Sequence, residues 1–118
     1  MITIASWNIN SVRIRINHLR KFIGEVKPDI VMLQEIKCSN DDFPDFHSDL
    51  DYKASINGQK GKFGVAVLVK KHLTFKKIEP SSEILNKESR VNFIYINELN
   101  LNLINVYTPN GNPMDNEE

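Results

Sequence analysis

The sequence predicts a single mixed α/β domain in which one parallel βαβ unit is followed by antiparallel strands. Two observations support this class. The first 34 residues contain an apolar run, an amphipathic helical segment and a second apolar run. The rest of the chain is rich in β-type segments and has no second strong helical pattern. A mostly β sheet with one strong helix leaves a face uncovered, so the chain looks like half of a sandwich.

The spacing of apolar residues predicts the βαβ unit. Residues 2–7 are β-branched and aromatic, which predicts a short strand. Ser11 is predicted to be the N-cap of a helix that ends before Pro28. Residues 29–34 include four apolar residues in a row, as in a strand covered on both faces. Strand, helix and strand in this order predict a parallel first pair. The predicted apolar face of the helix consists of Ile16, Leu19, Phe22, Ile23 and Val26.

The remainder is predicted to be mainly β. Residues 38–51 are acidic and turn-rich, with one short helical turn expected within residues 43–50. Residues 58–62 are predicted to be a tight connection, 80–88 a polar loop and 97–100 a hairpin turn. The predicted strands are 52–56, 63–69, 74–78, 91–97 and 101–107.

The composition of the chain excludes few classes of function. The chain has 118 residues, of which 41% are hydrophobic and 25% charged, as in an ordinary globular domain. Lys+Arg and Asp+Glu both number 15, so phosphate binding would have to come from a local patch. One cysteine, Cys38, excludes an internal disulfide and fits a reducing compartment. With no apolar run of roughly 18 residues and no basic, apolar leader, a cytoplasmic location is expected.

Polar side chains follow three of the predicted strands at the point where each strand ends. Ligands gather outside the carboxyl ends of strands in layered α/β folds. Glu35 could supply the carboxylate that Mg²⁺ requires, and Asn8 could orient it or contact a phosphate oxygen. Each residue alone has an ordinary structural explanation, for example Asn110-Gly111 as a turn pair. The joint pattern predicts a metal and phosphate site built from Asn8, Asn10, Glu35, Tyr107 and Asn110.

This joint pattern resembles the exonuclease III family of abasic-site endonucleases, within the endonuclease/exonuclease/phosphatase superfamily. The Gln34-Glu35 pair is shared across the superfamily, whereas the glycine–lysine–glycine loop and Tyr-x-Pro-Asn point to its DNA-repair branch. The resemblance runs over nearly the whole chain. Its motifs are residues 7–13, 27–30, 33–37, 58–61, 64–66, 90–91 and 107–110.

The resemblance implies a fold, a reaction and partners. The fold would be the N-terminal half of a four-layered α/β sandwich (DNase I-like), with a mixed, mostly antiparallel sheet after an initial βαβ unit. The reaction would be hydrolysis of the phosphodiester bond 5′ to an abasic site, accompanied by 3′-to-5′ exonuclease activity. The expected cofactor is Mg²⁺, with Mn²⁺ as the alternative. The expected substrate is double-stranded DNA with abasic sites.

The resemblance also implies roles for individual residues. Glu35 would ligate Mg²⁺, and Asn8 would help to orient the metal or the phosphate. Tyr107 and Asn110 would contact the scissile phosphate, so the catalytic set would be Tyr107, Asn110 and Asn8. The residues expected to lie near the metal or the DNA backbone are Asn10, Arg13, Gln59, Lys60, Gly61 and Arg90.

Two family motifs expected in the C-terminal half, Gly-Asp-x-Asn and Ser-Asp-His, do not occur in the sequence. Its only Ser-Asp pair, Ser48-Asp49, is followed by Leu50. We therefore expect residues 1–118 to be a partial domain that is not an efficient enzyme alone. One candidate partner is a separate C-terminal half that would complete the sandwich. Two alternatives remain open: a superfamily phosphatase acting on lipid or small-molecule phosphates, and a non-catalytic remnant or interaction module from a split gene.

Overall fold

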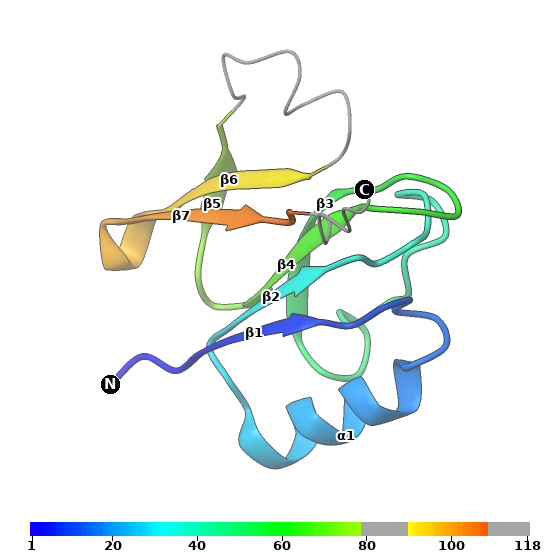
Figure 1. The fold of residues 1–118 in the computed structure, drawn as a ribbon. Coiled ribbons are helices and arrows are strands. Elements are labelled where there is room, and N and C mark those ends of the chain that lie inside the picture. Colours follow the sequence, from blue (N-terminus) through cyan, green and yellow to red (C-terminus); the bar gives the residue numbers. More distant parts are fainter. Residues whose placement is uncertain (79–89, 109–118) are drawn as a thin grey trace.

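Two sheets packed face to face form the body of the computed structural model, which describes residues 1–78 and 90–108 (Figure 1). The four-stranded sheet has the order β1-β2-β4-β3, and the three-stranded sheet has the order β5-β6-β7. Helix α1 (Ile16–Val26) covers the face of the four-stranded sheet opposite the three-stranded one (Figure 1). The strands are β1 (Ile4–Asn8), β2 (Ile30–Gln34), β3 (Tyr52–Asn57), β4 (Val65–Lys70), β5 (Phe75–Lys77), β6 (Val91–Ile96) and β7 (Leu101–Val106).

The predicted βαβ unit is confirmed. Strands β1 and β2 are parallel, with Ile4 opposite Ile30, and α1 lies between them in sequence. All other strand pairs of the described residues are antiparallel. The structure is thus mixed and mostly antiparallel, as predicted, but its strands divide into two sheets.

The predicted start of the helix is wrong. Ser11 has a left-handed φ of 84°, and its Oγ accepts a hydrogen bond from the Ile14 amide (3.3 Å) in a turn that precedes the helix. The helix itself begins at Ile16, with Arg15 in the N-cap position. Val26, assigned above to the apolar face, is 50% exposed, whereas Leu19 and Ile23 are buried.

The later elements follow the prediction with small shifts in their ends. All five predicted strands are present, whereas residues 43–50 form turns and no helix. A short 3₁₀ helix, η1 (Asn97–Leu99), with Asn100 at φ 47°, joins β6 to β7. The predicted polar loop at 80–88 lies outside the described residues. No helix in the described ranges is long and apolar enough to cross a membrane.

The core has two apolar layers, one on each face of the four-stranded sheet. The layer under α1 includes Leu19, Ile23 and Leu33. The layer between the sheets includes Val67 from β4 and Ile94 from β6. Burial of these side chains supplies the main driving force for folding and fixes the two sheets against each other.

Candidate functional site

One edge of the molecule gathers the ends of strands from both sheets. Because β1 and β2 are parallel, Asn8 and Gln34 lie opposite each other at their carboxyl ends. Gln34 is also opposite Val65, so the loop between β3 and β4 reaches the same edge. The amide of Tyr107 continues the ladder of β7 by donating to the Arg90 carbonyl (2.8 Å). The predicted site residues of both sheets therefore meet at one edge.

Glu35 is at the centre of this edge. Its Oε1 accepts a long hydrogen bond from Asn8 Nδ2 (3.4 Å), and its Oε2 lies 3.2 Å from Lys37 Nζ. The Glu35 side chain is 20% exposed. Its backbone is left-handed, with φ 59°, a conformation that costs a residue other than glycine about 1–3 kcal/mol. Such strain is typical of functional sites.

The loop segments that hold Glu35 are tied together by backbone hydrogen bonds. The Ser11 amide donates to the Glu35 carbonyl (2.9 Å), and the Ile36 amide donates to the Gly64 carbonyl (3.1 Å). Lys37 and Phe63, which are joined by a further bond of 2.9 Å, both have positive φ angles. These bonds fix an irregular backbone that no regular strand would provide.

Tyr107 approaches Glu35 from the other sheet. The pKa of the Tyr107 phenol is raised first by burial and then by the nearby Glu35 carboxylate. The Tyr107 ring is 6.0 Å from the ring of Phe63, and the Arg90 guanidinium carbon lies 5.3 Å from the centre of the same Phe63 ring. Tyr107 is thus a neutral hydrogen-bond donor held between an acidic and a basic neighbour.

The remaining predicted residues within the described ranges lie in the loop after β3, in the turn after β1 and just before β6. Lys60 and Gly61 are exposed in the loop that follows β3, and Gln59 is half-buried beside them. That loop is anchored where the Gly58 amide donates to Asn40 Oδ1 (2.7 Å). A methyl group on Gly58 would lie 2.5 Å from the Cys38 carbonyl oxygen, so the close approach requires glycine.

Asn10 and Arg13 lie on the turn that follows β1. Asn10 is exposed and left-handed, with φ 48°. Arg13 is exposed and its Nη1 is 3.8 Å from Asp42 Oδ2, so it is turned toward the acidic loop. Asn110 lies outside the described residues.

The structure therefore brings together Asn8, Glu35 and Tyr107, with Arg90 beside them. Two neighbours were not predicted as site residues, namely Lys37, which pairs with Glu35, and Phe63, which contacts Tyr107 and Arg90. Lys37 is part of the Gln34–Lys37 motif, so its sequence position was a usable signal. The role of Phe63 depends on contact between two sheets, and sequence periodicity does not report such contact.

The donor set fits a hard cation with few protein ligands. Within residues 1–78 and 90–108, no group of three or more His, Cys, Asp or Glu side chains is arranged to hold a metal ion. Mg²⁺ keeps most of its waters and needs only one or two protein carboxylates. Glu35, with the Asn8 amide beside it, is a donor of this kind, and Lys37 occupies part of the same carboxylate.

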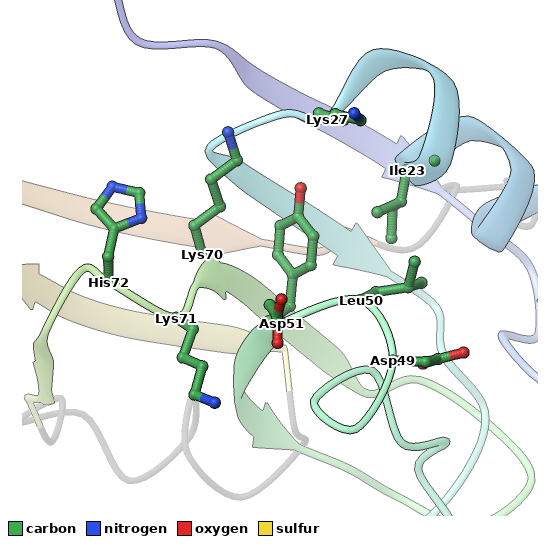
Figure 2. A pocket seen from close by; sticks show the side chains of 10 residues that line it. Ile23, Lys27, Asp49, Leu50, Asp51, Lys70, Lys71 and His72 are labelled. Carbon is green, nitrogen blue, oxygen red and sulfur yellow. The ribbon is translucent and has the colours of Figure 1, made fainter.

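A pocket of about 620 Å³ lies elsewhere, beside the end of α1 and the residues after β4. Figure 2 shows Lys70, Lys71 and His72 on one side of it and Leu50 on the other. Lys70 pairs with Asp29 (3.4 Å), just before β2 begins, whereas Glu35 follows the end of β2. None of the predicted site residues lines this pocket. The converging polar groups at the strand ends, not this pocket, therefore mark the candidate site.

A family model described as the Endonuclease/Exonuclease/phosphatase family matches residues 5–117, nearly the whole chain. The chain belongs to this family. Its fold is the DNase I-like α/β fold of these proteins, of which it forms a part.

Individual members of the family narrow the resemblance to exonuclease III and AP endonucleases. Exodeoxyribonuclease III of Haemophilus influenzae is 42% identical over 66 residues, which cover 55% of this chain and 25% of that protein. An AP endonuclease from Archaeoglobus fulgidus is 34% identical with a TM-score of 0.76. The 3′ phosphatase NExo from Neisseria, solved bound to a product DNA hairpin, is 27% identical with a TM-score of 0.77.

The match covers most of this chain but less than half of each relative. It covers 92% of this chain and 42% of the Archaeoglobus enzyme, and 94% and 43% for the Neisseria enzyme. The described residues thus correspond to the N-terminal part of the family fold.

Proposed function

We propose that this chain carries the N-terminal half of the active site of an exonuclease III-like DNA-repair nuclease. The reaction is hydrolysis of phosphodiester bonds 5′ to abasic sites in double-stranded DNA, with 3′-to-5′ exonuclease activity. The cofactor is Mg²⁺, with Mn²⁺ as the alternative. The observation that carries the proposal is the convergence of Asn8, Glu35 and Tyr107 from three strands of two sheets, in a family of phosphoester hydrolases.

The roles follow from the chemistry of each group. Glu35 holds the cation and Asn8 steadies the Glu35 carboxylate. When bound there, a divalent cation neutralises phosphate oxygens and lowers the pKa of a bound water. Tyr107 is protonated at neutral pH, since its pKa is raised above an ordinary value of 10.0, so it donates a hydrogen bond to a phosphate oxygen without adding negative charge. Asn110, which lies outside the described residues, would add an uncharged hydrogen-bond donor to the phosphate.

A local basic patch positions the DNA. The chain has no excess of positive charge, so bulk attraction does not bring it to DNA. Lys60 and Lys62 project from the loop after β3, and Arg90 lies beside Phe63 at the same edge. Asn10, Gln59 and Gly61 would add contacts to the DNA backbone, and Arg13 would do so after leaving Asp42. Such contacts to phosphates set register and orientation and do not read the base sequence.

A complementary half completes the site. The chain spans under half of its structural relatives, and Gly-Asp-x-Asn and Ser-Asp-His do not occur in its sequence. Removing one member of a cooperating catalytic group commonly lowers the rate by orders of magnitude. Residues 1–118 alone are therefore a poor nuclease, and adding the remainder of a full-length relative restores cutting.

The test is incision of a duplex that carries one abasic site. The purified chain is assayed alone and with the complementary half, in Mg²⁺ and in EDTA. Glu35→Gln removes the proposed ligand, and Glu25→Gln, an exposed position on α1, is the matched control. We expect the completed protein to cut only with Mg²⁺, Glu35→Gln to lose at least about a hundredfold, and Glu25→Gln to cut normally.

Three results would contradict parts of the proposal. Full Mg²⁺-dependent cutting by residues 1–118 alone, abolished by Glu35→Gln, would reject the need for a second half. Cutting that Glu35→Gln leaves intact would reject the assigned ligand. Preferential release of phosphate from a phosphoinositide, with abasic DNA untouched, would favour the lipid-phosphatase alternative.

A further inference from the structure

The three central site residues lie on strands that no single ladder connects. Asn8 ends β1 and Glu35 follows β2, and these two strands are hydrogen-bonded neighbours. Tyr107 follows β7, whose only partner among the described strands is β6 in the other sheet. Backbone pairing therefore sets the spacing of Asn8 and Glu35, but it does not set the distance from either to Tyr107.

The Gln34 side chain lies where the three strands meet. Its Nε2 lies 3.0 Å from Ser6 Oγ on β1 and 2.8 Å from Asn105 Oδ1 on β7, and also 3.3 Å from the Met32 carbonyl. Ser6 is two residues before Asn8, and Asn105 is two residues before Tyr107. Residues two apart in a strand project to the same side. Gln34 directly precedes Glu35, and its side chain contacts Ser6 below Asn8 and Asn105 below Tyr107.

Asn105 extends this contact into the four-stranded sheet. It is buried, with 2% exposure. Its Nδ2 lies 2.9 Å from the Leu33 carbonyl, 3.1 Å from the Ala66 carbonyl and 3.1 Å from Asn92 Oδ1. The side-chain amide of Asn105 on β7 therefore contacts β2, β4 and β6.

The hydrogen bonds of Gln34 and Asn105 are directional, whereas the apolar contacts around them are not. Most of the interface between the sheets is apolar, including Val67, Ile94 and Ile96, and such contacts tolerate small sliding movements. Hydrogen bonds weaken steeply when their angles are wrong, and a buried amide left unsatisfied is costly. The amides at this end of the interface therefore allow only one alignment of β7 against β2.

We propose that the Gln34–Asn105 amide pair is a positioning device that fixes Tyr107 against Glu35. The functional meaning of the pair rests on the nuclease function proposed above. Neither residue contacts the reacting atoms. If instead the pair only stabilised the core, its loss would lower stability without changing how Glu35 and Tyr107 interact.

A double-mutant cycle measures that interaction directly. Glu35→Gln and Tyr107→Phe are made singly and together, and urea midpoints are compared in EDTA without DNA. The cycle is repeated in an Asn105→Ser background, where the shorter side chain cannot span its partners, and in an Ile94→Val background. Ile94 is a buried interface residue opposite Leu103, so its variant is the matched control. Non-additivity in a cycle reports contact between the two residues.

We expect non-additive midpoint shifts in the wild-type and Ile94→Val backgrounds and additive shifts in Asn105→Ser. If Asn105→Ser does not fold, Gln34→Ala at a half-buried position replaces it, with the same expectation. Non-additivity that survives in the Asn105 or Gln34 variant overturns the proposal, as does additivity in the wild type or in Ile94→Val. Because metal and DNA are absent, this cycle and the incision assay can fail independently.

Discussion

At the scale of single residues, Glu35 shows how one carboxylate serves several neighbours. Glu35 accepts a hydrogen bond from Asn8, pairs with Lys37 and raises the pKa of Tyr107, and its backbone is left-handed. Lys37 supplies positive charge at the carboxylate where the proposal places a cation. Under that proposal, a cation at Glu35 would displace or share the ammonium of Lys37, and the charge of Lys37 would then be free to meet a phosphate.

The titration of Tyr107 is the first prediction at this scale. Its pKa is raised by burial, and further by the negative charge of Glu35. Glu35→Gln removes the charge but leaves the burial, so we expect the pKa of Tyr107 to fall toward its ordinary value of 10.0 without reaching it. The measurement is the pH dependence of the Tyr107 side-chain carbon signals by NMR.

Tyr52 is the control for this titration. The pKa of Tyr52 is also raised, first by burial and then by Asp29, at the other end of β2. It should not respond to Glu35→Gln. Since a raised pKa in the folded state favours the protonated form, both tyrosines stabilise the fold below pH 10 and lose that contribution as pH rises through their folded values. A Tyr107 titration unchanged by the substitution would contradict the contact with Glu35.

At the scale of elements, sequence periodicity identified the strands and the helix but not the backbone between them. The spacing of apolar residues predicted the β1–α1–β2 unit. Because ligands gather outside the carboxyl ends of strands, the positions of Asn8, Glu35 and Tyr107 just past strand ends predicted that they share one edge. The late start of α1 was missed because Ser11 adopts a left-handed turn bonded to Glu35, a residue far along the chain. Asn105 was missed because a strand asparagine reads as solvent-facing unless its partners in the other sheet are known.

Gly64 gives a second prediction, because its backbone supports the Glu35 segment. It has φ 88°, and a Cβ there would lie 2.7 Å from Ile36 Cγ1. We expect Gly64→Ala to destabilise the fold by about 1–3 kcal/mol through strain and overlap. The measurement is the free energy of unfolding in urea.

Gly24 is the contrasting glycine, at which substitution by alanine should stabilise the fold. It lies inside α1, is exposed, and nothing lies within 4 Å of the position a Cβ would take. Gly24→Ala should stabilise by about 0.5–1 kcal/mol, because alanine loses less backbone freedom in a helix. Equal effects of the two substitutions would show that Gly64 has no special conformational role.

At the scale of the whole molecule, the sequence predicted a sheet face that no helix covers, and the described residues contain such a face. Alternation along β7 turns Asn105 toward the four-stranded sheet and leaves Ile104 and Val106 on the outside, 54% and 48% exposed. In the described residues the only α-helix packs on the other sheet. The sequence could predict an uncovered face from its shortage of helices, but it could not say which face, since that depends on how the two sheets stack.

Ile104 tests whether this face receives the complementary half. Ile104 lies opposite Phe93 on the outer side, so Ile104→Arg should cost residues 1–118 less than about 1 kcal/mol. It should nevertheless prevent association with the remainder of a full-length relative, because a charge buried without a partner is strongly unfavourable. Sedimentation of the mixture measures this. Ile14→Arg, at a 72% exposed position before α1, is the control and should leave association unchanged. Equal association of both variants would place the complementary half on another surface.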